Sequence, residues 1–215
     1  MRKASQKKKL HSIYLKLFAA FGPQHWWPAK TPFEVMVGAI LTQNTNWANV
    51  EKAIDQLKQH KVLDPERIHH LSTSKLARLI KSAGYYNIKT KRLKAFLKFL
   101  FDHYKGDPKK MSRVPGLKLR SQLLSINGIG PETADSILLY ALQKPLFVID
   151  AYTKRIMARH GFIAEDSSYQ DVQNLFMQNL KKEVKLFNEY HALFVRLGKE
   201  FCLKRKPLCE RCPLK

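Results

Sequence analysis

The sequence predicts an all-α protein of roughly ten helices joined by short turns. Apolar residues recur at intervals of three and four, which is the period of a helix with one buried face. The alternation of apolar and polar residues that indicates strands is scarce. Short breakers rich in Gly and Pro separate the periodic segments, and no low-complexity linker interrupts the chain. We therefore expect one large helical domain or two that pack closely.

The periodicity is clearest in residues 10–21, 50–57 and 93–100, and each of these segments is expected to be a helix. Later in the chain Pro145 ends a helix, residues 146–149 form a short buried connector, and the next periodic segment begins after Asp150. The breakers between helices are Gly22-Pro23, Pro28 to Pro32, Asp64-Pro65, Gly84, Gly106 to Pro108, Pro115-Gly116, Gly128 to Pro131 and Gly161.

The composition excludes several classes of protein. The 215 residues are 45% hydrophobic and 11% aromatic, which is the composition of a chain that folds. Three cysteines, all between Cys202 and Cys212, do not make a secreted disulfide framework and favour a reducing compartment. No segment approaches the roughly 20 apolar residues of a membrane span, and the N-terminal segment lacks a signal-peptide core.

The charge requires a polyanionic partner. The chain has 39 Lys and Arg against 17 Asp and Glu, a formal net charge of +22. These cations are spread along the chain and do not form one basic amphipathic segment, so nucleic acid is favoured over an anionic membrane surface. The charge therefore predicts a nucleic-acid partner. Nine cations occur between residues 67 and 101 with no acidic residue among them: Arg67, Lys75, Arg78, Lys81, Lys89, Lys91, Arg92, Lys94 and Lys98.

A glycine hairpin precedes one of the predicted helices. Gly128, Gly130 and Pro131 mark a turn and a helix start, because proline at the first helical position gives up only an N–H that has no partner. Glycine lets the backbone approach a ligand, and a helix N-terminus offers free N–H groups to a phosphate. An ordinary helix-turn-helix corner is the alternative. The upstream cations favour DNA binding.

Asp150 begins the helix after the connector, where an isolated aspartate is usually an N-cap. The hairpin, the helix and the connector ending in Asp150 together resemble the helix-hairpin-helix DNA glycosylases of the endonuclease III superfamily. The resemblance extends from about Pro32 to the C-terminus. It implies that Asp150 is the catalytic carboxylate and that the hairpin residues Gly128, Gly130 and Thr133 bind DNA.

The same resemblance implies two helical lobes with DNA across the cleft between them. Residues 33–146 would form a six-helix barrel lobe that contains the hairpin, and residues 1–32 with 147–215 would form the second lobe. Gln43 matches the glutamine that fills the gap left in the duplex by the extruded nucleotide; a polar loop residue is the alternative. Gly84 matches an architectural glycine at the start of a family helix.

Two further matches to the family indicate the type of reaction and the class of damaged base. Bifunctional members carry a lysine at the position of Glu132, where its amine forms a Schiff base, so Glu132 implies a monofunctional enzyme without AP-lyase activity. In the 3-methyladenine branch a Trp-Trp-Pro segment, a nearby aromatic residue and this glutamate line the base pocket. Cation–π attraction of about 0.5–2 kcal/mol would favour a positively charged methylpurine there, whereas core anchoring is the alternative role for paired tryptophans. The matching residues are Trp26, Trp27, Pro28, Trp47 and Glu132.

The cysteines resemble the first three ligands of the family's [4Fe-4S] loop. Their pattern is Cys202-x6-Cys209-x2-Cys212, and the fourth ligand would fall beyond Lys215. A cluster is the implied cofactor, and zinc with a histidine such as His160 or His191 is the alternative. The cations between the first two cysteines match residues that meet the DNA backbone in cluster-bearing relatives: Lys204, Arg205 and Lys206.

The resemblance therefore implies a monofunctional DNA glycosylase of base excision repair, expected to be a cytoplasmic, nucleoid-associated monomer that acts on double-stranded DNA. It would hydrolyse the N-glycosidic bond of a flipped-out alkylated purine such as 3-methyladenine. One alternative is an endonuclease III-like enzyme for oxidised pyrimidines or mismatched bases. Another is a non-catalytic helix-hairpin-helix module that only binds DNA, against which Asp150 at its family position argues.

Overall fold

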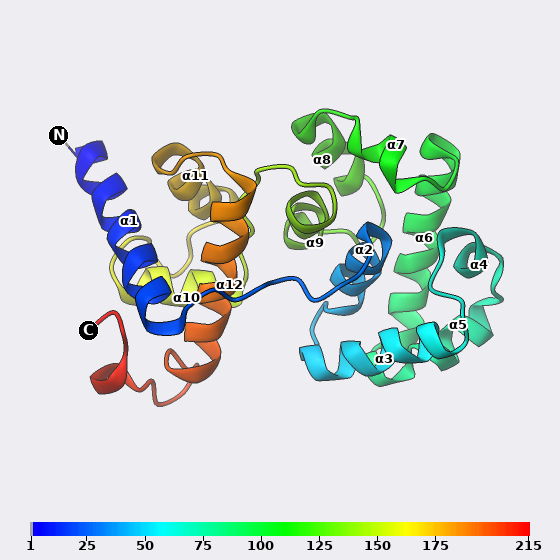
Figure 1. Ribbon diagram of the computed structural model, residues 1–215, viewed down its shortest axis with the longest axis horizontal. Helices are drawn as coiled ribbons and strands as arrows, with labels where there is room; N and C mark the ends of the chain where they lie inside the picture. Colours follow the sequence, from blue (N-terminus) through cyan, green and yellow to red (C-terminus); the bar gives the residue numbers. More distant parts are fainter. Residues whose placement is uncertain (1) are drawn as a thin grey trace. The chain divides into compact units, whose positions relative to one another are not determined.

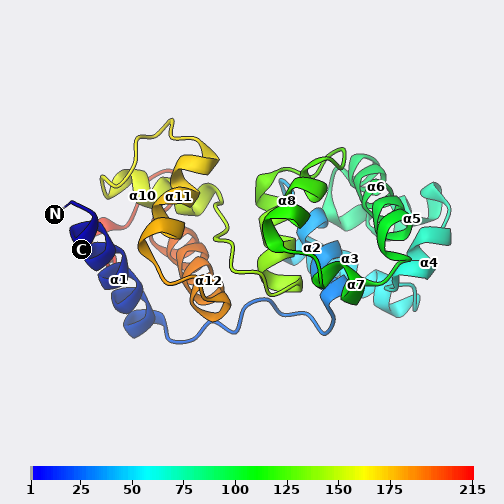
Figure 2. The same cartoon turned by 90° about the horizontal axis from the view of Figure 1, so that it is seen from above.

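The structure is a computed structural model that describes residues 2–215, with side chains from Ser5 onward. The described part of the chain contains twelve α-helices and no strand, which confirms the all-α prediction. It divides into two compact units: Met1–Pro28 with Pro145–Lys215, and Ala29–Lys144 (Figure 1 and Figure 2). Among the helices described, none is long and apolar enough to cross a membrane.

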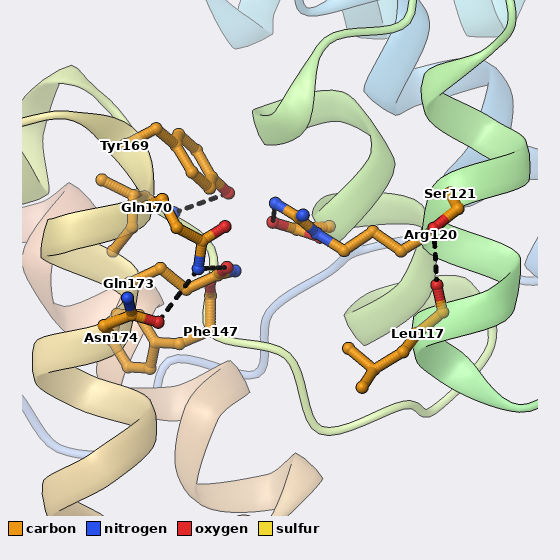
Figure 3. A network of polar contacts seen from close by, with 10 residues as sticks. Leu117, Arg120, Ser121, Phe147, Tyr169, Gln170, Gln173 and Asn174 are labelled. Carbon is orange, nitrogen blue, oxygen red and sulfur yellow. Dashed lines mark hydrogen bonds and ion pairs between the residues drawn. The ribbon is translucent and has the colours of Figure 1, made fainter.

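The first unit is built around a cluster of aromatic side chains. Phe147 and Phe176 stack with ring centroids 4.0 Å apart, and the Tyr190 hydroxyl donates to the Leu10 carbonyl at 2.8 Å. Gln173 also donates to the Phe147 carbonyl, at 2.8 Å (Figure 3). The predicted buried connector is therefore present, and it is fixed in place just before Asp150. The helices of this unit are α1 (Arg2–Phe21), α10 (Ala151–Arg159), α11 (Tyr169–Asn179) and α12 (Val184–Glu200).

The second unit surrounds one apolar helix. Every residue of α2 (Pro32–Leu41) from Phe33 onward is buried, as expected for a helix that is hydrophobic on all sides. It packs against α3, α6, α9 and the π turn that follows α9. The other helices are α3 (Trp47–Gln59), α4 (Pro65–His70), α5 (Thr73–Leu79), α6 (Tyr86–Tyr104), α7 (Pro108–Ser112), α8 (Gly116–Leu124) and α9 (Pro131–Ser136).

Proline and short polar side chains start most of these helices. Thr31 caps α2 by accepting from the Glu34 amide at 3.1 Å, and Asn46, Asp64, Ser72, Asp107, Asp150 and Ser168 cap other helices in the same way. The breakers of the sequence are therefore caps and first turns. Four helices have proline in their first turn: Pro32, Pro65, Pro108 and Pro131.

The helix after the hairpin differs in one respect from the expectation. It is α-helical only to Ser136 and continues as a π turn over Ile137–Ala141, all of whose side chains are buried. The described residues form twelve α-helices, against the roughly ten predicted. Short helices such as α4, α5 and α7 are the hardest to predict, because five to seven residues are too few for apolar periodicity to show.

Candidate active site

Asp150 caps α10. Its Oδ1 accepts from the Thr153 amide at 2.7 Å, and its backbone is extended, with φ −113° and ψ 179°. The preceding residue, Ile149, donates its amide to the Tyr169 hydroxyl at 3.3 Å. Asp150 is thus an N-cap, but capping uses one carboxylate oxygen and leaves Oδ2 for another role.

The other oxygen of this carboxylate lies near a histidine. His191 Nε2 of α12 lies 3.6 Å from Asp150 Oδ2, and the two side chains are 7% and 11% exposed. Burial by itself would raise the pKa of Asp150, but the charge of His191 and the hydrogen bond from the Thr153 amide hold that pKa below its ordinary value. Asp150 is therefore a nearly buried carboxyl group that stays ionised.

The two hairpin glycines have different surroundings. Gly128 has φ +85°, and a Cβ there would lie 2.4 Å from Arg92 Cγ, so both its conformation and its close packing require glycine. The expected close approach at Gly128 is therefore made by this chain's own arginine. Among the described residues, and apart from the chain neighbours of Gly130, no heavy atom lies within 4 Å of the position that a Cβ of Gly130 would take. Open space at the start of α9 is what an approaching ligand needs.

Gln43 is bound to this hairpin. Its Nε2 donates to the Gly128 carbonyl and to Thr133 Oγ1, both at 2.9 Å, while its Oε1 accepts from Arg92 Nη1. Separate motifs in the sequence had assigned Gln43, Gly128 and Thr133 to DNA contact, and the structure places all three together. Arg92, which links them, was noticed in the sequence only as one of many cations.

A buried lysine supports the same region. Lys89 of α6 is 1% exposed, and its Nζ donates to the carbonyls of Leu41 at 2.8 Å and Ala83 at 2.7 Å. Burial, together with the charge of Arg92, lowers its pKa to about 8. Lys89 thereby ties the end of α2, just before Gln43, to the start of α6.

The predicted base-pocket residues are divided between the two units. Trp26 and Trp27 belong to the first unit, half-buried with ring centroids 5.2 Å apart, and Pro28 is exposed. Trp47 begins α3 and is half-buried, whereas Glu132 is exposed in the first turn of α9. Both of these belong to the second unit. A shared base pocket stays a prediction.

The three cysteines do not gather into a ligand set. Cys202 is buried with its Sγ 3.3 Å from Arg159 Nη1, Cys209 is exposed and Cys212 is half-buried. Within residues 2–215 no group of three or more His, Cys, Asp or Glu side chains is arranged to hold a metal ion. The described residues therefore do not fit the expected cluster or its zinc alternative, and we assign no step of the reaction to either.

Arginines of α10 hold the cysteine loop. Arg155 donates to the carbonyls of Gly198 at 3.0 Å and Cys202 at 2.8 Å. Arg159 donates to the carbonyls of Leu203 at 2.7 Å and Lys204 at 3.1 Å. The side chains of the loop cations point to solvent: Lys204, Arg205 and Lys206 are exposed.

The comparison with protein families decides the identity. The model of the HhH-GPD superfamily of base excision DNA repair proteins matches residues 37–182. The chain belongs to this superfamily. The predicted helix-hairpin-helix DNA glycosylase is therefore confirmed at the level of the superfamily, while its substrate class and its lack of lyase activity stay predictions.

Individual relatives are similar over most of the chain. A protein of Methanocaldococcus jannaschii named as a DNA repair glycosylase is 48% identical over 215 residues, 99% of this chain and 97% of the relative. Endonuclease III of Sulfolobus acidocaldarius is 29% identical over 184 residues, covering 85% of this chain and 79% of the relative. The H. pylori 3-methyladenine DNA glycosylase, solved with 1,N6-ethenoadenine, is 28% identical with a TM-score of 0.77 over 92% of this chain and 97% of that chain.

Proposed function

We propose that this member of the HhH-GPD superfamily binds double-stranded DNA and hydrolyses the N-glycosidic bond of an alkylated purine such as 3-methyladenine, without cleaving the strand. The observation that carries the proposal is Asp150, nearly buried yet ionised at the start of α10. The likeness to the H. pylori 3-methyladenine glycosylase supports the substrate class. Glu132 at the position of the imine-forming lysine supports the absence of lyase activity.

A carboxylate suits this reaction because positive charge develops on the sugar as the base departs. Asp150 would stabilise the oxocarbenium-like charge at C1′ or orient the attacking water, and its charge acts strongly because water is largely excluded around it. A cationic methylpurine is a good leaving group. The enzyme then supplies little beyond this charge and the extrusion of the nucleotide, which costs a few kcal/mol.

DNA contacts would come from the hairpin, Gln43 and exposed cations. Gly130, at the start of α9, is exposed, and the backbone amides there would bind a phosphate of the DNA backbone. Gln43 would leave its hydrogen bonds to the Gly128 carbonyl and Thr133 Oγ1 and fill the gap in the duplex. Thr133 would remain with the hairpin residues that bind DNA. The exposed loop cations would add phosphate contacts whose strength falls with salt: Lys204, Arg205 and Lys206.

A set of duplexes, each carrying one lesion, tests the proposal. The lesions are 3-methyladenine, 7-methylguanine, 1,N6-ethenoadenine, an oxidised pyrimidine and a mismatched thymine. We expect alkali-labile abasic sites with alkylated purines and none with the last two. Release of an oxidised pyrimidine or mismatched thymine would favour the endonuclease III-like alternative, and binding without any base release would favour the non-catalytic module.

We expect reaction products to keep an intact strand until they are treated with alkali. Borohydride should trap no covalent enzyme–DNA complex, because the carboxylate of Glu132 cannot form an imine. Gel electrophoresis after borohydride treatment measures this, with Glu132→Lys as the matched variant that restores an amine at the family position. A trapped adduct with the wild-type chain would show that another lysine serves and that the enzyme is not monofunctional.

We expect Trp27→Ala to lose more activity toward cationic methylpurines than toward neutral lesions. Cation–π attraction of about 0.5–2 kcal/mol corresponds to roughly a 2-fold to 30-fold difference in rate between the two lesion classes. Single-turnover rates on matched duplexes measure it, and Trp27→Phe should retain part of the preference. Equal losses on both classes, or a lowered melting temperature that accounts for the loss, would assign Trp27 to the core.

A further inference from the structure

We propose that His191 is a positioning residue that keeps Asp150 in its ionised form and fixes the orientation of its carboxylate. The inference rests on the proposed function, in which Asp150 is the reacting carboxylate. The sequence indicates His191 only as a candidate metal ligand, whereas the structure places it beside Asp150. Its Nε2 atom lies 3.6 Å from Asp150 Oδ2. Helix α10, which Asp150 caps, and helix α12, which carries His191, pack against each other (Figure 1).

The position of His191 is set by its neighbour in the chain. Tyr190 is fully buried, donates its hydroxyl to the Leu10 carbonyl at 2.8 Å and stacks on Phe194 with ring centroids 4.7 Å apart. These contacts fix the rotation of α12 about its own axis. His191 is therefore held facing Asp150, the residue just before α10. The side chains of this pair are both nearly buried.

The other polar groups close to Asp150 in sequence or in space have hydrogen bonds of their own. Its own helix supplies the Thr153 amide to Oδ1, and Tyr169 of α11 accepts from the Ile149 amide. Within the described chain, His191 is the charged group whose interaction lowers the pKa of Asp150. The charged side chains close in sequence to Asp150 and His191 bind other groups: Lys154 Nζ donates to the Ser167 carbonyl (2.7 Å), Arg155 Nε donates to the Cys202 carbonyl (2.8 Å), and Glu189 Oε1 accepts from the Gln24 amide (2.7 Å).

His191 stabilises the charged form of the Asp150 carboxyl group. A buried carboxyl without a cationic neighbour takes up a proton more readily, because burial penalises the anion. A protonated Asp150 carries no negative charge to stabilise a developing cation at C1′. Removal of His191 should therefore reduce catalysis by neutralising Asp150, with little effect on phosphate contacts made by the hairpin.

Two variants of His191 separate charge from packing. His191→Leu removes both the charge and the N–H donor, whereas His191→Gln keeps a donor without the charge. His11→Leu, at an exposed histidine of α1, is the matched control. The first readout needs no activity: the carboxyl ¹³C resonance of Asp150, assigned by its disappearance in Asp150→Asn, is followed against pH in the full-length chain.

In the wild-type chain and in His11→Leu we expect this resonance to titrate below the ordinary range of aspartate. In His191→Leu it should titrate above that range, with His191→Gln between them. Titration of Asp150 at the same pH in wild type and in a folded His191→Leu would overturn the inference, whether or not the protein excises bases. Absence of excision from every duplex in the lesion set would refute only the proposed function.

The second readout is single-turnover excision on the duplex that the wild type cleaves best. We expect His191→Leu to lose at least about tenfold in rate near neutral pH, with the dissociation constant for DNA unchanged. The acid side of its pH–rate profile should move to higher pH, and His191→Gln should recover part of the shift. A uniform loss at every pH would show a purely structural role and contradict the proposal.

Discussion

The Asp150→Asn variant should release almost no base. We expect its single-turnover excision rate to fall by at least about 100-fold to 1,000-fold, the loss typical when one group that stabilises transition-state charge is removed. Affinity for DNA should stay the same or increase, because the substitution removes a negative charge that repels phosphate. The two measurements together separate a loss of chemistry from a loss of binding.

This substitution also distinguishes catalysis from helix capping. Asparagine is as good an N-cap as aspartate, so the bond from the Thr153 amide is kept and the melting temperature at neutral pH should change little. The carboxylate charge alone is removed. An excision rate within tenfold of wild type would reduce Asp150 to a helix cap and favour the non-catalytic DNA-binding module.

Local chemistry explains why much of the fold was predictable. Pro131 in the first turn of α9 and Asp150 before α10 determine helix starts within a few residues of themselves, and the apolar connector between them is buried as its composition indicates. Nothing local joins Asp150 to His191 or Gly128 to Arg92. Those pairs come from different helices, and only tertiary packing brings them together.

The run of cations between residues 67 and 101 shows a second limit. In the sequence this run of cations favours a nucleic-acid partner, but two of its lysines donate to backbone carbonyls at helix ends of the second unit. Lys89 is buried against the Leu41 and Ala83 carbonyls, and Lys94 donates to the Ile68 and His69 carbonyls at 2.9 and 2.7 Å. Charge count alone does not tell a capping lysine from a DNA-binding one.

The cysteines show that residue spacing alone does not predict a metal site. Their spacing matches three positions of a cluster loop, yet Cys202 packs beside Arg159, and Cys209 is exposed. The loop is held through its backbone carbonyls by Arg155 and Arg159. Spacing along the chain defines a metal site only when the fold brings the sulfur atoms to one point.

Asp135→Asn should cause the largest loss of stability among single substitutions near the hairpin. Arg120 of α8 and Asp135 of α9 form an ion pair with two hydrogen bonds, from Nε to Oδ1 at 2.7 Å and from Nη2 to Oδ2 at 3.0 Å, and Asp135 is fully buried. The pair joins the two helices of the hairpin. Neutralising Asp135 leaves a poorly hydrated guanidinium charge, which should lower the free energy of unfolding by about 3–5 kcal/mol.

Two controls make this prediction specific, with unfolding followed in urea by circular dichroism. Asp102→Asn breaks the exposed Lys98–Asp102 pair of α6, whose side chains are 74% and 50% exposed, and should change the free energy by less than about 1 kcal/mol. The double variant Arg120→Met with Asp135→Leu removes both charges and should regain most of the lost stability, because no buried charge is left without its partner. If Asp135→Asn unfolds at the same urea concentration as Asp102→Asn, the pair between α8 and α9 does not hold the hairpin.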